Sequence, residues 1–149
     1  MNRILLSTLS LAIVLGLGAC KPETPAEVQE DVAEANAEAA DEVREQQADA
    51  SETVAEANQE IAEANADGDL EDQAEARADA TEDTAQARYD VEIAKAEGAL
   101  SVAKERCDGL ADSERDACNA DAQAEYEDAK ARATSDLEAA KAQADAIDR

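Results

Sequence analysis

The stretch Cys107-Asp108-Gly109-Leu110-Ala111-Asp112-Ser113-Glu114-Arg115-Asp116-Ala117-Cys118 separates two long segments whose apolar residues recur every three or four positions. That spacing is typical of amphipathic helices. Gly109 suits a helix end, while Ser113 with Asp116 three residues later forms a capping-box pattern at a helix start. We therefore expect one helix to end at about Cys107 and a second to begin at Ser113 after a tight reversal.

The apolar residues of the two segments match when the segments fold back antiparallel with Cys107 facing Cys118. The stripe before the reversal contains Leu70, Ala74, Ala78, Thr81, Ala85, Tyr89, Ile93, Ala96, Leu100, Ala103 and Cys107. The stripe after it contains Cys118, Ala122, Tyr126, Ala129, Ala133, Leu137, Ala140, Ala144 and Ile147. Pairing runs from Ala103 with Ala122 to Ala85 with Ala140. This agreement predicts a helical hairpin over residues 70–149.

A third helix is expected over residues 26–66, because Val28, Val32, Val43, Val54 and Ile61 fall within an arc of about 80° at 100° per residue. Gly68 can end it in a left-handed conformation, and Asp69 can cap the next helix. Stripe-to-stripe pairing places Ala39 opposite Ala96. The fold class is therefore all-α, with long alanine-rich helices in an elongated antiparallel hairpin or an up-down-up three-helix bundle.

The first helix also repeats every eleven residues. Val32, Val43 and Val54 have this spacing, and Val-Ala-Glu-Ala-Asn occurs at 32–36 and again at 54–58. An eleven-residue period favours nearly straight helices or a slight right-handed supercoil. Low-complexity drift in an alanine-rich gene is an equally good explanation.

Composition excludes several classes of function. The 149 residues carry a formal net charge of -25, only 1% are aromatic, and histidine is absent. Such a chain repels nucleic acid, and it lacks the commonest general base and transition-metal ligand. Ser101, Ser113 and Ser135 are better explained as helix-surface or capping residues than as nucleophiles. We expect a non-enzymatic protein with no catalytic residues, metal site, cofactor or small-molecule substrate.

The N-terminus has the pattern of a secretory leader. Arg3 precedes an uncharged apolar run that starts at Ile4 and ends at Leu17-Gly18-Ala19-Cys20. This motif resembles the lipobox of bacterial lipoproteins. The resemblance implies that residues 1–19 are a cleaved signal peptide, that Cys20 receives acyl chains such as palmitate, and that residues 20–25 form an anchored tether. Lys21, where an inner-membrane retention signal has aspartate, implies the periplasmic face of the outer membrane.

A periplasmic location bears on the two remaining cysteines. Disulfides form and persist in that oxidising compartment, and Cys107 and Cys118 lie on facing stripes. We therefore predict a Cys107–Cys118 disulfide. Two buried free thiols or a redox pair are the alternatives, although redox cysteines are usually separated by two residues at a helix start.

The segment from Tyr89 to Lys95, through Val102 to Cys107 and on to Cys118, resembles small alanine-rich envelope proteins of proteobacteria. The general plan is also similar to the major outer-membrane lipoprotein, except that Arg149 stands where that family has its attachment lysine. These resemblances imply a structural or spacer lipoprotein of the cell envelope. Its partners would be the membrane, envelope proteins or further copies of itself. A periplasmic binding or chaperone-like module and a stress-protection helical repeat protein are the alternatives.

Overall fold

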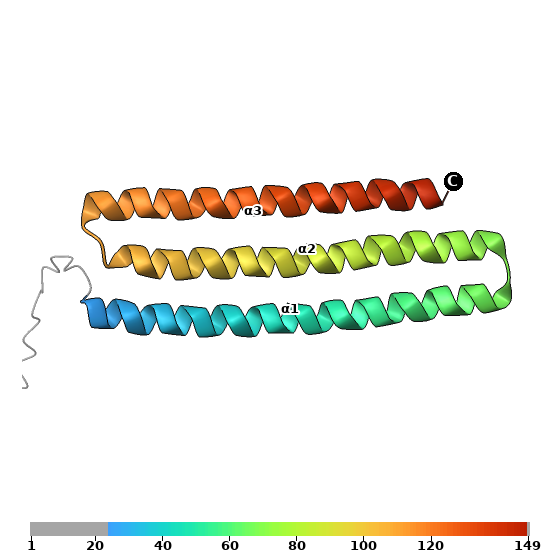
Figure 1. Cartoon of the computed structure of the whole chain (residues 1–149), viewed down its shortest axis with the longest axis horizontal. Coiled ribbons are helices and arrows are strands. Elements are labelled where there is room, and N and C mark those ends of the chain that lie inside the picture. The colour runs from blue at the N-terminus through green and yellow to red at the C-terminus, as the bar shows by residue number, and fades with distance from the viewer. Residues whose placement is uncertain (1–23, 149) are drawn as a thin grey trace, which may run out of the picture.

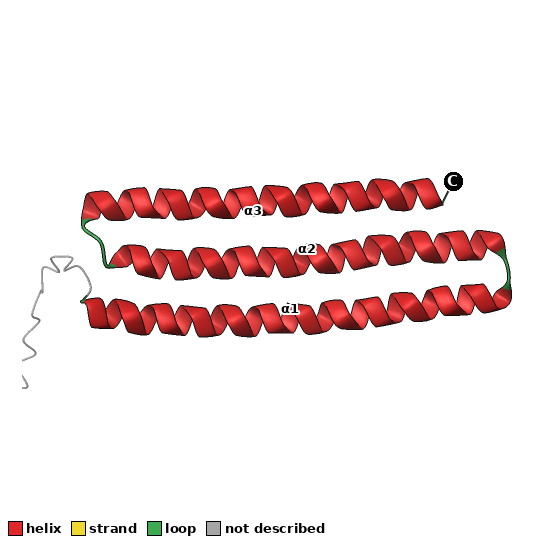
Figure 2. Ribbon diagram, in the orientation of Figure 1, coloured by secondary structure: helices red, strands yellow, loops and turns green. Residues whose placement is uncertain are grey.

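A computed structural model describes residues 24–148 as three long helices joined by two short turns (Figures 1 and 2). They are α1 (Pro25–Asp67), α2 (Leu70–Asp108) and α3 (Asp112–Ile147). Their 43, 39 and 36 residues give lengths of about 64, 58 and 54 Å. The all-α, up-down-up prediction is confirmed. The predicted leader, Cys20 and Arg149 lie outside the described residues.

The first helix begins with a complete capping box. The Thr24 hydroxyl accepts a hydrogen bond from the Glu27 backbone N–H, and the Glu27 carboxylate accepts one from the Thr24 backbone N–H at 2.8 Å. Pro25 is the first helical residue, which corrects the prediction that the tether extends through it. Proline fits there because the first helical N–H has no partner inside the helix.

The reversal between α1 and α2 follows the prediction. Gly68 has a φ of 81°, the left-handed conformation that glycine adopts without steric cost, and its N–H donates to the Ala64 carbonyl. Asp69 caps α2 by accepting a hydrogen bond from the Glu71 N–H at 2.9 Å. These two residues turn the chain back on itself within a few positions.

The reversal between α2 and α3 differs in detail. Gly109 has a φ of -74°, so it is not a left-handed helix end. The α3 helix begins at Asp112 after Ala111, which makes no side-chain cap, so the prediction that Ser113 is the cap is wrong. Gly109 instead eases the contact with α1, because a Cβ atom there would lie 3.0 Å from Cγ2 of Val28 and that side chain would have to shift slightly.

The three helices form a single layer with α2 in the middle (Figure 1). Within residues 24–148, α1 and α3 each pack on α2 and not on each other. The predicted α2 stripe, which contains Ala78, Ala96 and Cys107, faces α3. A second stripe about 130–170° away around the helix faces α1. Its buried members are Ala80, Val91, Ala94, Gly98 and Val102.

The two stripes correct the sequence-based pairing, which used one side of α2 for both neighbours. Two opposite apolar stripes leave polar residues on both exposed faces of the helix, as a single layer requires. The register shifts accordingly. Gly98 lies against Ala39, two positions beyond the expected Ala96, and a Cβ atom added to Gly98 would lie 2.6 Å from the Cβ of Ala39. Glycine is therefore the residue that permits this close helix contact.

The core consists mainly of small side chains. The buried apolar residues are Ala35, Ala57, Ala78, Ala80, Val91, Ala94, Ala96, Val102, Cys107, Ala122, Ala133 and Ala144. Alanine contacts allow helix axes to approach to about 8 Å, and alanine also has the highest helix propensity. The layer thus depends on intrinsic helicity and close contact more than on bulky apolar burial.

Candidate functional site

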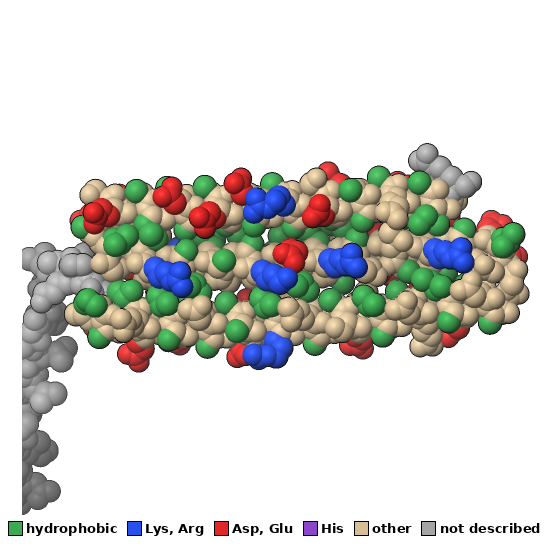
Figure 3. All heavy atoms as spheres, in the orientation of Figure 1, with side chains coloured by type: hydrophobic (Ala, Val, Ile, Leu, Met, Phe, Trp, Pro, Cys, Tyr) green, Lys and Arg blue, Asp and Glu red, His purple; other side chains and the backbone are tan. Residues whose placement is uncertain are grey.

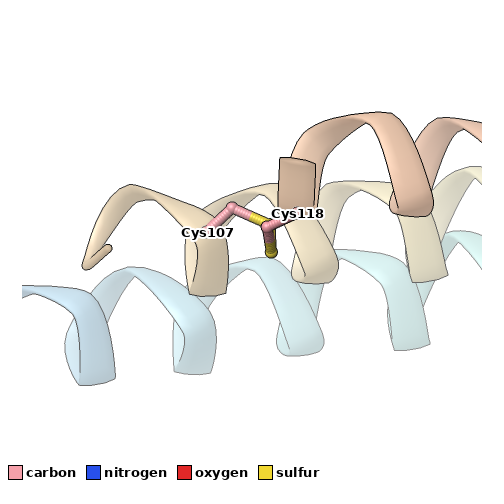
Figure 4. Close-up of a disulfide and its surroundings, with 2 residues drawn as sticks. All are labelled: Cys107 and Cys118. Carbon is pink, nitrogen blue, oxygen red and sulfur yellow. A yellow bond between two sulfur atoms is a disulfide. The ribbon is translucent and has the colours of Figure 1, made fainter. Parts of the chain in front are cut away.

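A disulfide joins the last turn of α2 to the start of α3 (Figure 4). Cys107 and Cys118 have Cα atoms 5.7 Å apart, and Cys107 is 0% exposed. Exchange with an external thiol requires access to a sulfur atom; Cys107 is fully buried and Cys118 is half-buried, which favours a structural clamp. The predicted pairing is confirmed.

The disulfide lies at the end of the layer where the chain enters from residue 24. Gly109 contacts Val28, which is within the first turns of α1. The α1–α2 turn at Gly68 lies at the opposite end (Figure 1). The end nearest Cys20 in the sequence therefore carries both the capping box and the disulfide.

One face of the layer contains an open groove of about 850 Å³ along α2. We call this side the groove face. All three helices line the groove. Its apolar wall residues include Val54 and Ile61 of α1, Tyr89 of α2, and Leu137 and Ile147 of α3.

The groove lining carries charges of both signs, because Glu92 of α2 and Asp136 of α3 line it together with two arginines. The arginines are Arg77 and Arg88 of α2, and neither has a carboxylate within ion-pair distance among residues 24–148. Arg77 Nη2 only donates a long hydrogen bond to Asn65 Oδ1 at 3.4 Å. Further along α2, Lys95 pairs with Glu92 at 2.7 Å. Figure 3 shows lysine and arginine side chains following the middle helix on this face.

The groove is suited to binding. Its hydroxyl groups belong to Thr81, Thr84 and Tyr89, and the Thr81 hydroxyl donates to the Arg77 carbonyl oxygen at 2.7 Å. Apolar walls beside unpaired guanidinium groups fit a partner that is apolar at its flanks and anionic at its centre.

The remaining chemistry of the described chain is limited. Two hydrogen bonds from Thr24 lower the pKa of Glu27 below 4.5; the backbone N–H of Thr24 contributes more than its hydroxyl group. Across residues 24–148, no group of three or more ligand-type side chains is arranged to hold a metal ion. The helices in this range also contain no apolar stretch long enough to cross a membrane.

The structure brings together only one of the site features expected from sequence. Cys107 and Cys118 meet as predicted, whereas Cys20 lies outside the described residues. Sequence reasoning missed the two unpaired arginines of the groove. A signal for them was present, because Arg77 and Arg88 are eleven residues apart and so lie on one side of α2.

Comparisons with known proteins returned no match. No protein family model fits the chain, and no curated protein or solved structure is significantly similar to it.

Proposed function

We propose that this chain is a non-enzymatic, lipid-anchored spacer lipoprotein of the bacterial cell envelope. The observation that carries the proposal is the position of a stiff three-helix layer directly after the lipobox-like motif. Thr24, which caps α1, is four residues after Cys20. Acyl chains on Cys20 would therefore join the membrane to the layer through a very short tether.

The shape supports a spacer. The helix α1 is about 64 Å long, and the other two helices run beside it for most of that length. The capping box and disulfide strengthen the end nearest the anchor. A net charge of -25 repels anionic headgroups, which favours a layer that extends away from the membrane over one that lies on it. We propose the periplasmic face of the outer membrane as its location.

Mass spectrometry of the native protein under non-reducing conditions tests the proposal. We expect loss of residues 1–19, the mass of two or three acyl chains on Cys20, and two missing hydrogens for the Cys107–Cys118 bond. A Cys20→Ala variant should leave the membrane fraction. Recovery of the processed wild-type chain in the soluble fraction with an unmodified Cys20 would refute lipid anchoring.

The groove favours a second candidate, a periplasmic binding module. An open groove with unpaired Arg77 and Arg88 can bind an acidic partner. Binding of such a partner should weaken as salt concentration rises, because exposed charges are screened. A partner captured equally well by an Arg77→Glu/Arg88→Glu variant would argue against use of this groove.

A further inference from the structure

Four cations form a straight row along the groove face of α2. Arg77, Arg88, Lys95 and Arg106 are separated by eleven, seven and eleven residues. At about 100° per residue these steps keep all four within about 20° around the helix. Arg77 and Arg88 line the groove, so the row follows its direction. We call these four residues the cation row.

Four acids on α1 have the same spacing. Asp31, Glu42, Asp49 and Glu60 are also separated by eleven, seven and eleven residues and also stay within about 20° around their helix. We call them the acid row. Asp49 lines a shallow hollow with residues of α2 that lie opposite the cation row around that helix. The acid row is therefore on the face of the layer opposite the groove.

The two rows are level with each other along the layer. Ala39 lies against Gly98 and Val28 against Gly109, and the helices are antiparallel. Moving one residue toward the N-terminus of α1 therefore corresponds to moving one residue toward the C-terminus of α2. Counting from these contacts pairs each cation with one acid at the same height: Arg77 with Glu60, Arg88 with Asp49, Lys95 with Glu42, and Arg106 with Asp31. Within one molecule the rows occupy opposite faces and do not meet.

We propose that the groove of one molecule receives α1 of a second copy that stands parallel and level with it. The acid row of the second copy then lies over the cation row of the first, and its helix becomes a fourth helix between α1 and α3. This inference deepens the proposed function and rests on it, because acyl anchors in one membrane hold the copies parallel and at one height.

Charge selects this arrangement over a symmetric one. Two molecules packed groove face to groove face would bring one cation row against another, which is repulsive. The adjoining helices do not add to this preference. In the front-to-back contact, Lys104 of the second copy comes level with Asp121 of the first, which is favourable. Glu97 comes level with Asp128, and Asp90 comes within one residue of the level of Asp136, and both of these approaches are unfavourable. The two charged rows therefore decide the register.

A front-to-back contact leaves one groove and one acid row free at the ends. Such heterologous contacts build open rows or closed rings of copies. The spacer would then form a row of parallel copies at one height on the membrane surface.

Cysteine cross-linking between two co-expressed variants in the intact envelope tests the register. Thr81 and Ala99 lie on the groove face of α2, and Glu56 and Glu38 lie beside the acid row. The proposed contact places Thr81 level with Glu56, and Ala99 level with Glu38. Mild oxidation should cross-link Thr81→Cys to Glu56→Cys, and Ala99→Cys to Glu38→Cys.

The controls are the two mismatched combinations, Thr81→Cys with Glu38→Cys and Ala99→Cys with Glu56→Cys. They use the same residue types on the same faces but are about 27 Å out of register, so their yield should be at least tenfold lower. Equal yields from all four combinations, or no cross-link from the matched pairs, would overturn the proposal.

Charge reversal provides an independent test. Adding Arg77→Glu and Arg88→Glu to the groove partner should lower the matched cross-link at least tenfold. Lys130→Glu with Lys141→Glu, an equal change in charge outside the contact, should leave the yield unchanged. A loss in both variants, or in neither, would contradict a contact through the cation row.

Mass spectrometry of the same membranes separates this inference from the proposed function. Acylated Cys20 without matched cross-links overturns the inference and leaves the anchor intact. Matched cross-links on a chain without acyl mass overturn lipid anchoring and support the contact between copies.

Discussion

Replacement of Gly98 by alanine tests the packing of α1 on α2. In an exposed helix this change stabilises by about 1 kcal/mol, because alanine has the higher helix propensity. Here the new Cβ would lie 2.6 Å from the Cβ of Ala39. Carbon atoms in contact prefer about 3.5–4.0 Å, so the helices must separate locally by about 1 Å.

The clash should outweigh the gain in propensity. Overpacking of a well-packed contact costs about 1–3 kcal/mol. Subtracting about 1 kcal/mol of propensity gives an expected net destabilisation of about 1 kcal/mol for Gly98→Ala. That corresponds to a fall in melting temperature of about 3 °C for a chain of this size.

A double-mutant cycle isolates the contact. Ala39→Gly alone should destabilise by about 1 kcal/mol through propensity. The double variant exchanges the two residues and relieves the clash, so it should lie within about 0.5 kcal/mol of the wild type. The resulting coupling is about 1.5 kcal/mol, measured by urea denaturation followed by far-ultraviolet circular dichroism.

Ala37→Gly is the matched control, because Ala37 is exposed on α1 only two residues from Ala39. It should cost a similar propensity and show no coupling to Gly98→Ala. The reasoning is refuted if Gly98→Ala stabilises the protein by about 1 kcal/mol, or if Ala37→Gly couples to it as strongly as Ala39→Gly does.

The other predictions concern the helix ends. Reduction of the Cys107–Cys118 bond, whose cysteines are 11 residues apart, should lower stability by about 2.8 kcal/mol from loop entropy and release α3 first, as measured by hydrogen exchange with and without reductant. Uniform loss of protection in all helices would contradict the prediction that α3 is released first. Thr24→Ala should raise the pKa of Glu27 only part of the way toward 4.5, because the larger lowering comes from the Thr24 backbone; a carboxyl NMR titration that shows no rise would argue against the box. Since the folded pKa is lowered, this cap stabilises α1 above about pH 4.5 and is lost as the pH falls through the folded value. Gly68→Ala should cost about 1 kcal/mol in thermal denaturation, because alanine is strained at a φ of 81°, and an unchanged melting temperature would show that this turn does not need glycine.

Much of the fold follows from local sequence. Alanine, glutamate and lysine favour helix throughout, proline is absent after Pro25, and Gly68 with Asp69 marks a turn whose geometry depends on neighbouring residues alone. The Cys107–Cys118 pairing was also within reach, because helical periodicity and a short reversal bring both residues to one seam.

Tertiary structure decided how the helices are arranged around α2. The sequence contains two apolar stripes on that helix, but periodicity does not tell which neighbour each stripe contacts. Close contact between Gly98 and Ala39 sets the register of α1, and packing of α1 and α3 on opposite sides of α2 produces a single layer. Only this arrangement places the cation row and the acid row level on opposite faces, because relative height and face depend on helix packing and not on local propensity.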